Sequence, residues 1–345
     1  MKIPSIEGDQ NPLTVVRLLW CGQGMTALVE IYNDGVEKKE ADFLGLVNCG
    51  GDSLYADGAL DYITEKVEAR HLKLLNLVVL TRLDASHTSL LDDLGARLQN
   101  IGALGLYAFI AGGRKDIPDS VGTFLTRLGY QPHDIAFASE GQSSYSTPGI
   151  PGWIGEHNGT YFRILASNQK SVVLVVDNGR FSIVTPGELT PETLEGTRKL
   201  GTLKGLLSPV FALVLPEDET LATAVKNHLS SPTATGDAEW ELLTWFAGEI
   251  SPANIGVSAG PQNPFHHPIA QVIELFSANL QEDVPHTYVT FVLPTPGDPA
   301  KNFSGWIIKP TELGIRSTVA ELGTGAPYRE IKYVFTLRPT SVEKA

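Results

Sequence analysis

The chain has 345 residues, of which 42% are hydrophobic and 19% charged, so it can bury a large core and is too apolar to be disordered. Its formal net charge of −13 disfavours binding to nucleic acid through the overall field. It contains two cysteines, Cys21 and Cys49, which we interpret as buried thiols rather than a disulfide framework. The first 12 residues lack the apolar stretch of a secretory signal, and no run of 18 apolar residues follows, so we expect a cytoplasmic protein without a membrane span.

Hydrophobic patterning in the first half predicts strands alternating with helices after a polar leader, residues 1–12. The predicted strands are Val15–Trp20, Thr26–Tyr32, Phe43–Val47, Leu77–Leu80 and Leu104–Ile110. The predicted helices are Ala59–Leu74, Leu90–Asn100 and Asp119–Leu128. A connection rich in Ser, Gly and Pro, Asp134–Gly152, then reads as irregular.

The second half repeats the same alternation of elements. Its predicted strands are Tyr161–Ala166, Ser171–Asp177, Phe181–Thr185, Phe211–Leu215, Asn254–Ser258, Thr287–Leu293, Ser304–Lys309 and Ile331–Leu337. Its predicted helices are Thr190–Leu200, Thr220–Leu229, Glu239–Phe246 and Pro268–Leu280. Two sheets flanked by helices would bury the apolar faces of all these elements.

The stretch from Asn76 to Leu94 is the best candidate for a functional site. The buried strand Leu77–Leu80 ends in the polar turn Thr81-Arg82-Leu83-Asp84-Ala85-Ser86-His87, and a helix follows. A short loop that carries Asp84 and His87 between two rigid elements is well placed for chemistry.

Seven short segments, taken in order, resemble the motifs of the metallo-β-lactamase fold, and most closely the hydrolase domain of competence proteins, which form DNA-uptake channels. They are Cys21-Gly22-Gln23-Gly24-Met25, Val47-Asn48-Cys49-Gly50-Gly51, Thr81–His87, Asn168-Gln169-Lys170-Ser171, Pro186-Gly187-Glu188, Leu215-Pro216-Glu217-Asp218 and Asn263-Pro264-Phe265-His266-His267-Pro268. The resemblance implies an α/β protein, a four-layer αβ/βα sandwich of two mixed sheets flanked by helices. It covers residues 13–309 and leaves 310–345 as a C-terminal extension that ends in a strand.

The fold usually holds two metal ions, and the resemblance implies which residues occupy the ligand positions. Asp84, His87 and His267 match the family, and Glu188 stands where a bridging Asp is expected. The other positions differ: Arg82 replaces a His, Ser86 replaces an Asp, and Glu217 or Asp218 replaces a second His. Asn48 also replaces an Asp that supports the ligands from behind.

Arg82 is the most informative of these changes. A guanidinium stays protonated and has no lone pair, so it cannot ligate a metal. It brings a permanent positive charge into a pocket that contains Asp84, Glu188 and Asp218, and it could pair with those carboxylates in place of a metal. We therefore expect no metal ion at the position nearest Arg82.

Three functions remain open from the sequence. The first is a degenerate, non-catalytic centre in a pseudoenzyme that acts as a binding or regulatory subunit of a cytoplasmic complex with a protein partner. The second is a hydrolase of the phosphodiesterase or nuclease type that uses one zinc or manganese ion, at most, on His87, Glu188 and His267. The third is a metal-free pocket in which Arg82 binds an anion such as a nucleotide phosphate.

Overall fold

A computed structural model describes most of the chain. The described residues are 12–103, 109–111, 117–129, 136–138, 141, 143–145, 153–179, 181–215, 228, 234–258, 270–280, 291–292, 307–308, 315–317 and 330–336.

The first sheet has seven strands within these residues, in the order β16-β1-β2-β3-β4-β5-β6. The pairs β16–β1, β1–β2 and β2–β3 are antiparallel, whereas the pairs β3–β4, β4–β5 and β5–β6 are parallel. The bounds are β1 Leu13–Leu19, β2 Thr26–Tyr32, β3 Phe43–Cys49, β4 Leu77–Leu80, β5 Phe109–Ala111, β6 Ala136–Phe137 and β16 Glu330–Thr336.

The second sheet also has seven strands in the described part, in the order β15-β12-β11-β10-β9-β8-β7. Strands β7 to β10 are antiparallel, and β10, β11, β12 and β15 are parallel. The bounds are β7 Trp153–His157, β8 Thr160–Ser167, β9 Val172–Asp177, β10 Ser182–Pro186, β11 Val210–Leu215, β12 Asn254–Val257 and β15 Ile315–Ser317. A separate pair is formed by β13 Phe291–Val292 and β14 Ile307–Ile308.

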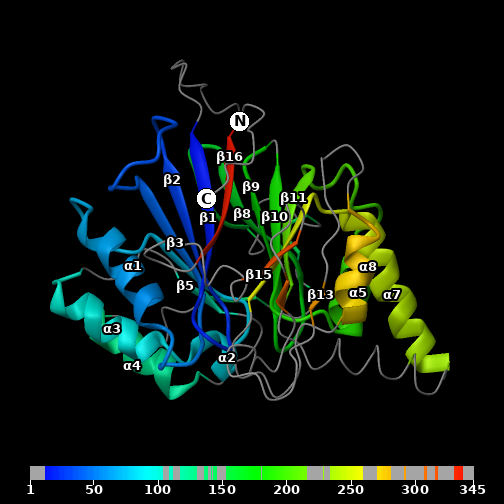
Figure 1. Cartoon of the computed structure of the whole chain (residues 1–345), viewed down its shortest axis with the longest axis horizontal. Coiled ribbons are helices and arrows are strands. Elements are labelled where there is room, and N and C mark those ends of the chain that lie inside the picture. The colour runs from blue at the N-terminus through cyan, green and yellow to red at the C-terminus, as the bar shows by residue number, and fades with distance from the viewer. Residues whose placement is uncertain are drawn as a thin grey trace.

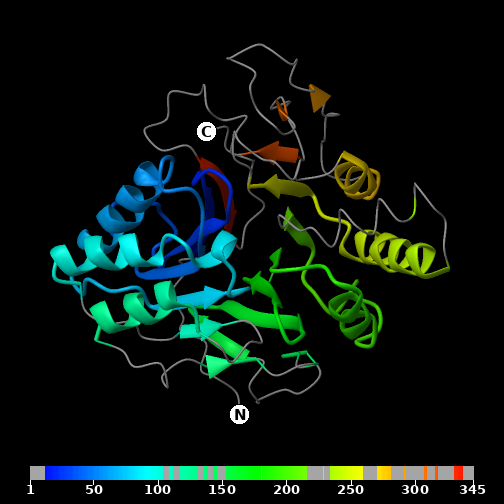
Figure 2. The ribbon, with the colours of Figure 1, turned by 90° about the horizontal axis from the view of Figure 1, so that it is seen from below.

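The helices lie on the two outer faces of the sheets (Figures 1 and 2). On the side of the first sheet are α1 Asp57–Glu68, α3 Leu91–Asn100 and α4 Asp119–Arg127, together with the short α2 Ala85–Thr88 that follows β4. On the side of the second sheet are α5 Pro191–Arg198, α7 Ala234–Ile250 and α8 Ala270–Ser277.

Among the described residues, three large apolar clusters lie between and beneath these layers, and a small fourth one contains Ala138, Ile164 and Val172. The central one joins the inner faces of the sheets, for example Val29 of β2 with Phe162 of β8. The other two large ones lie beneath the helices, around Phe124 of α4 and around Phe246 of α7. Because the central strands are covered on both faces, every residue of β1, β2, β3 and β4 is buried, which explains their nearly uninterrupted apolar sequences. The predicted fold class, two mixed sheets flanked by helices, is confirmed.

The C-terminal residues contribute an edge strand to each sheet. Strand β16 pairs with β1 over its full length, from Leu13 opposite Thr336 to Leu19 opposite Glu330, and β15 pairs with β12. The division into a leader at 1–12, a domain at 13–309 and an extension at 310–345 stays a prediction.

Some elements differ from the sequence-based expectation. Strand β6 falls inside the stretch predicted to be irregular, β7 was not predicted, and α7 begins at Ala234 and ends at Ile250, well outside the predicted Glu239–Phe246. Among the described residues, none of the helices combines the length and apolar character that crossing a bilayer requires.

Candidate functional site

Loops from both sheets meet at the carboxyl ends of β3, β4 and β10, and we call this side of the molecule the site edge. The contacts are backbone to backbone and depend on glycine: a Cβ on Gly50 would lie 2.1 Å from the Ser86 carbonyl oxygen, and one on Gly187 would lie 2.4 Å from that of Thr81. The Met25 amide also donates to the Ser86 carbonyl at 2.9 Å. This close packing fixes the turn after β4 and the Gly187-Glu188 turn after β10 against each other.

Asn48, at the end of β3, supports the turn after β4 from behind. It adopts a left-handed backbone, with φ of 57°, and is fully buried. Its side chain donates to Thr81 Oγ1 at 2.9 Å and accepts from the Thr81 amide at 2.7 Å. An amide supplies both a donor and an acceptor, so this position supports the loop without adding a charge to the pocket.

Arg82 lies among carboxylates, as the sequence predicts. Its Nε is 2.6 Å from Asp84 Oδ2, and its Nη1 is 4.0 Å from Glu188 Oε1. The Arg82 side chain is 21% exposed and that of Glu188 is 8% exposed, so the guanidinium reaches inward from the rim. The structure thus brings together Arg82 and Asp84 from the loop after β4 with Glu188 from the loop after β10.

The second oxygen of Asp84 receives two further donors. Ser86 Oγ donates to Asp84 Oδ1 at 2.6 Å, and His87 Nδ1 lies 2.7 Å from the same oxygen. A carboxylate accepts only, so His87 Nδ1 is the donor in this contact. Ser86 Oγ is also 2.9 Å from His87 Nδ1.

These contacts favour the ionised form of Asp84. Burial of the carboxyl opposes ionisation, but the hydrogen bond from His87, the electrostatic attraction of His87 and the charge of Arg82 outweigh it. With the added hydrogen bond from Ser86, they hold the pKa of Asp84 well below its usual range. Asp84 is therefore ionised at neutral pH and orients both Arg82 and His87.

His87 is buried, with 1% of its surface exposed, in the short helix α2. Its Nε2 makes no hydrogen bond within the described part of the chain. Because Nδ1 carries the proton that is donated to Asp84, a neutral His87 presents a lone pair at Nε2. A histidine held by a carboxylate on one nitrogen and open on the other is the usual arrangement of a metal-binding imidazole.

The other predicted site residues, Glu217, Asp218 and His267, lie outside the described residues. Within the residues that the structure describes, no group of three or more His, Cys, Asp or Glu side chains is arranged to hold a metal ion. The metal set His87, Glu188 and His267 therefore stays a prediction. Cys21 and Cys49 are both buried and are not joined in a disulfide, and burial raises the pKa of Cys49.

Sequence reasoning missed a second group of polar residues, far from this edge. Glu249 of α7 accepts hydrogen bonds from the backbone of Leu203 and Lys204, across 46 and 45 residues of chain. A lone Glu near the end of a helix carries no motif, so no pattern in the sequence could have indicated this contact.

The chain was compared with known families and structures. No family model matches the sequence, and no curated protein matches it. Among solved structures it is similar to the metallo-β-lactamase fold protein YhfI from Bacillus subtilis, at 12% identity, with a TM-score of 0.42, over 77% of this chain and 93% of that one. It is also similar to Zn²⁺-bound PqqB from Methylobacterium extorquens, at 14% identity, with a TM-score of 0.33, over 59% of this chain and 72% of that one. A third is the Rm3 metallo-β-lactamase, at 15% identity, with a TM-score of 0.29, over 68% of this chain and 90% of that one. These likenesses concern the fold, and none of them assigns an activity to this chain.

Proposed function

We propose that this chain is a metallo-β-lactamase-fold protein of the competence-protein type whose dinuclear centre has been lost, and that it acts as a binding or regulatory subunit of a cytoplasmic complex. One observation carries the proposal: Arg82 Nε lies 2.6 Å from Asp84 Oδ2, and its guanidinium also faces Glu188. The cation that balances these two carboxylates belongs to the protein itself.

A fixed guanidinium in this place opposes a dinuclear centre in two ways. It has no lone pair to give to a metal, so one ligand position is lost. It also repels a cation: two unit charges 4 Å apart interact by about 4 kcal/mol at an effective dielectric constant of about 20, and a divalent ion at that distance by about twice as much. The residues present therefore do not fit two metal ions.

A partner that is a protein suits this chain better than nucleic acid. The net charge of −13 repels a phosphate backbone unless a basic surface compensates for it. The basic side chains Arg97 and Arg127 on the outer helices are each paired with acidic ones, Arg97 with Asp57 and Asp61, and Arg127 with Asp92.

A second candidate function, a hydrolase with one metal ion, is favoured by the buried Nε2 of His87. His87, Glu188 and His267 would be the residues that hold one zinc or manganese ion, which would supply an activated water. Asp84 would then orient His87 through Nδ1, at 2.7 Å. The third possibility, an anion such as a nucleotide phosphate on Arg82, has less support because Asp84 and Glu188 already compensate the charge of the guanidinium.

Metal analysis of protein purified without chelator tests the proposal. We expect no stoichiometric zinc or manganese in the wild-type protein, and uptake of metal when Arg82→His is combined with Ser86→Asp, because this variant replaces the cation and restores two ligands. The matched control is Arg198→His, which removes an exposed arginine on α5 and should leave the protein metal-free.

One metal ion per wild-type chain, lost in His87→Ala, would overturn the proposal in favour of the hydrolase. A thermal shift with nucleotides that disappears in Arg82→Ala would favour the anion-binding pocket instead. Purification of the tagged chain from its native host with a stoichiometric protein partner would support the role as a subunit.

A further inference from the structure

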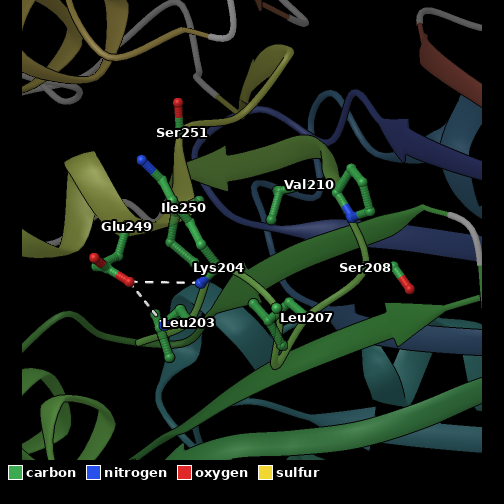
Figure 3. A pocket seen from close by; sticks show the side chains of 10 residues that line it. Leu203, Lys204, Leu207, Ser208, Val210, Glu249, Ile250 and Ser251 are labelled. Carbon is green, nitrogen blue, oxygen red and sulfur yellow. Dashed lines mark hydrogen bonds between the residues drawn. The ribbon is translucent and has the colours of Figure 1, made fainter. Parts of the chain in front are cut away.

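A cavity of about 610 Å³ lies beside the start of β11, at the end of the second sheet that is remote from Arg82. It is open to solvent and is lined by the loop that leads into β11 and by the turn that ends α7 (Figure 3). Strands β10 and β11 are parallel, so the cavity at the start of β11 and Glu188 beyond the end of β10 lie at opposite ends of the strands. Its volume falls in the range of small-molecule sites in proteins, about 300–1,000 Å³.

The lining of the cavity is apolar at its base. Leu203, Leu207, Val210 and Ile250 contribute to it, and each of them is at most 7% exposed. These side chains belong to the apolar cluster beneath α5, α7 and α8, so the base is part of the core rather than of a mobile surface. It offers a rigid surface for a small apolar group.

Glu249 supplies a carboxylate to the same cavity. Its Oε2 accepts hydrogen bonds from the Leu203 amide at 2.7 Å and from the Lys204 amide at 3.5 Å (Figure 3). Its Oε1 accepts no hydrogen bond from any residue that the structure describes. The two backbone contacts hold the carboxylate in place, and its Oε1 keeps the capacity to accept a hydrogen bond from a ligand.

Two serines line the cavity, and both use their hydroxyl proton within the protein. Ser208 Oγ donates to Asp177 Oδ1 at 2.9 Å, and Ser251 Oγ donates to the Asn279 carbonyl at 2.7 Å. Each hydroxyl has a single proton, so neither serine has a proton left to donate to a ligand.

We propose that this cavity binds a small primary amine with an apolar body. The ammonium group donates to Glu249 Oε1, and the apolar body packs on Leu203, Leu207 and Ile250. Lys204 also lines the cavity, but this residue is exposed, so water and salt screen the repulsion between its ammonium group and the ligand, whereas the backbone holds Glu249 in place. This site is separate from the Arg82 pocket and does not depend on whether that pocket holds a metal.

Titration of isotope-labelled full-length protein by NMR tests the proposal with four compounds of similar shape. They are 3-methylbutylamine, 3-methylbutanol, 3-methylbutanoate and leucine. We expect the amine to bind with a dissociation constant on the order of 1 mM, as for a small fragment, and to shift the amide signals of the loop from Leu203 to Ser208. The alcohol and the carboxylate should bind about tenfold more weakly or not at all, since they offer no cation to Glu249.

Glu249→Gln keeps an oxygen for the two backbone amides but removes the charge, so it should weaken binding of the amine about tenfold and abolish the preference over the alcohol. Glu241→Gln, an exposed glutamate on the same helix, is the matched control and should bind the amine as the wild type does. Binding of leucine would support the ammonium site and identify amino acids or chain N-termini as its ligands. Equal binding of the alcohol or the carboxylate, no binding of the amine, or shifts confined to another region would overturn the proposal, and the comparison in the wild type does not depend on the variant folding.

Discussion

Two clusters of charged residues in the first sheet each contain an arginine and a carboxylate. They differ in whether all their hydrogen-bonding atoms have partners within the protein. Beneath α1, the fully buried Glu30 is 2.6 Å from Arg17 Nε and 2.8 Å from Lys66 Nζ, and it accepts hydrogen bonds from the hydroxyls of Tyr62 and Tyr32. Both oxygens of this carboxylate are satisfied from within the protein. We interpret the cluster as structural, because it has no remaining capacity for a ligand.

The cluster at the sheet edge is different. Asp84 is satisfied by Arg82, Ser86 and His87, yet its side chain is 37% exposed, and the Nε2 of His87 has no hydrogen-bond partner in the described part of the chain. A closed cluster contributes to stability and an open one keeps unused donors and acceptors. We therefore interpret the open cluster as the candidate functional site.

The largest expected effect is from Glu30→Ala. Removing this carboxylate leaves Lys66 without its counter-ion and Arg17 with only the partly exposed Glu37 as a partner. Breaking a buried ion pair typically costs 3–5 kcal/mol, so we expect about that decrease in the free energy of unfolding. Glu68→Ala, at the exposed end of α1, should change stability by less than about 0.5 kcal/mol. Asp84→Ala should cost only about 1 kcal/mol, because that cluster is partly solvated. Denaturation in urea measures all three, and an equal loss for Glu30→Ala and Asp84→Ala would remove the distinction between the clusters.

The next effect concerns the turn that carries Glu188. A methyl group on Gly187 would collide with the backbone of Thr81, 2.4 Å away, and the backbone cannot move without disturbing the turn after β4. Gly187→Ala should therefore destabilise the protein by about 1–3 kcal/mol. Gly122→Ala, in α4, meets no atom within 4 Å and should instead stabilise it by up to about 1 kcal/mol, which thermal unfolding would show. Equal melting temperatures of the two variants would contradict the tight packing at the site.

Much of the fold was predictable from the sequence because the central strands are covered on both faces. Runs such as Leu77–Leu80 are apolar throughout, and Leu77–Leu80 is also the observed extent of β4. Strand β6, with two residues, and β7 were not predictable, since their pairing depends on neighbouring strands rather than on their own pattern. Helix α7 was predicted too short because its first residues include Thr235 and Gly236, which have low helix propensity.

The site was predictable in part for a similar reason. The ends of β4 and β10 bring Arg82, Asp84 and Glu188 to one edge, as the order of the motifs implies. The hydrogen bonds among Asp84, Ser86 and His87 were not predictable. They depend on the short helix α2, which the sequence indicates only as a polar turn. The cavity at Glu249 depends on a contact between distant segments, and such contacts leave no local pattern.

The smallest expected effect is the pH dependence of the stability that the cluster around Glu30 contributes. Burial opposes ionisation of Glu30, but the charges of Arg17 and Lys66 and the hydrogen bonds from Lys66 and Tyr32 outweigh it and lower its pKa below the usual value of 4.5. A carboxyl with a lowered pKa binds protons more readily in the unfolded chain, so its contribution to stability is complete above about pH 4.5 and is lost as the pH falls from there toward the lowered value. Unfolding in urea at a series of pH values should show a steeper loss of stability below pH 4.5 in the wild type than in Glu30→Gln. Asp84 also has a lowered pKa, but it titrates in both proteins, so the difference between the two slopes reports Glu30 alone. Equal slopes in the two proteins would mean that Arg17 and Lys66 do not stabilise the ionised form of Glu30. The contrast between this buried cluster and the one around Asp84 would then be lost.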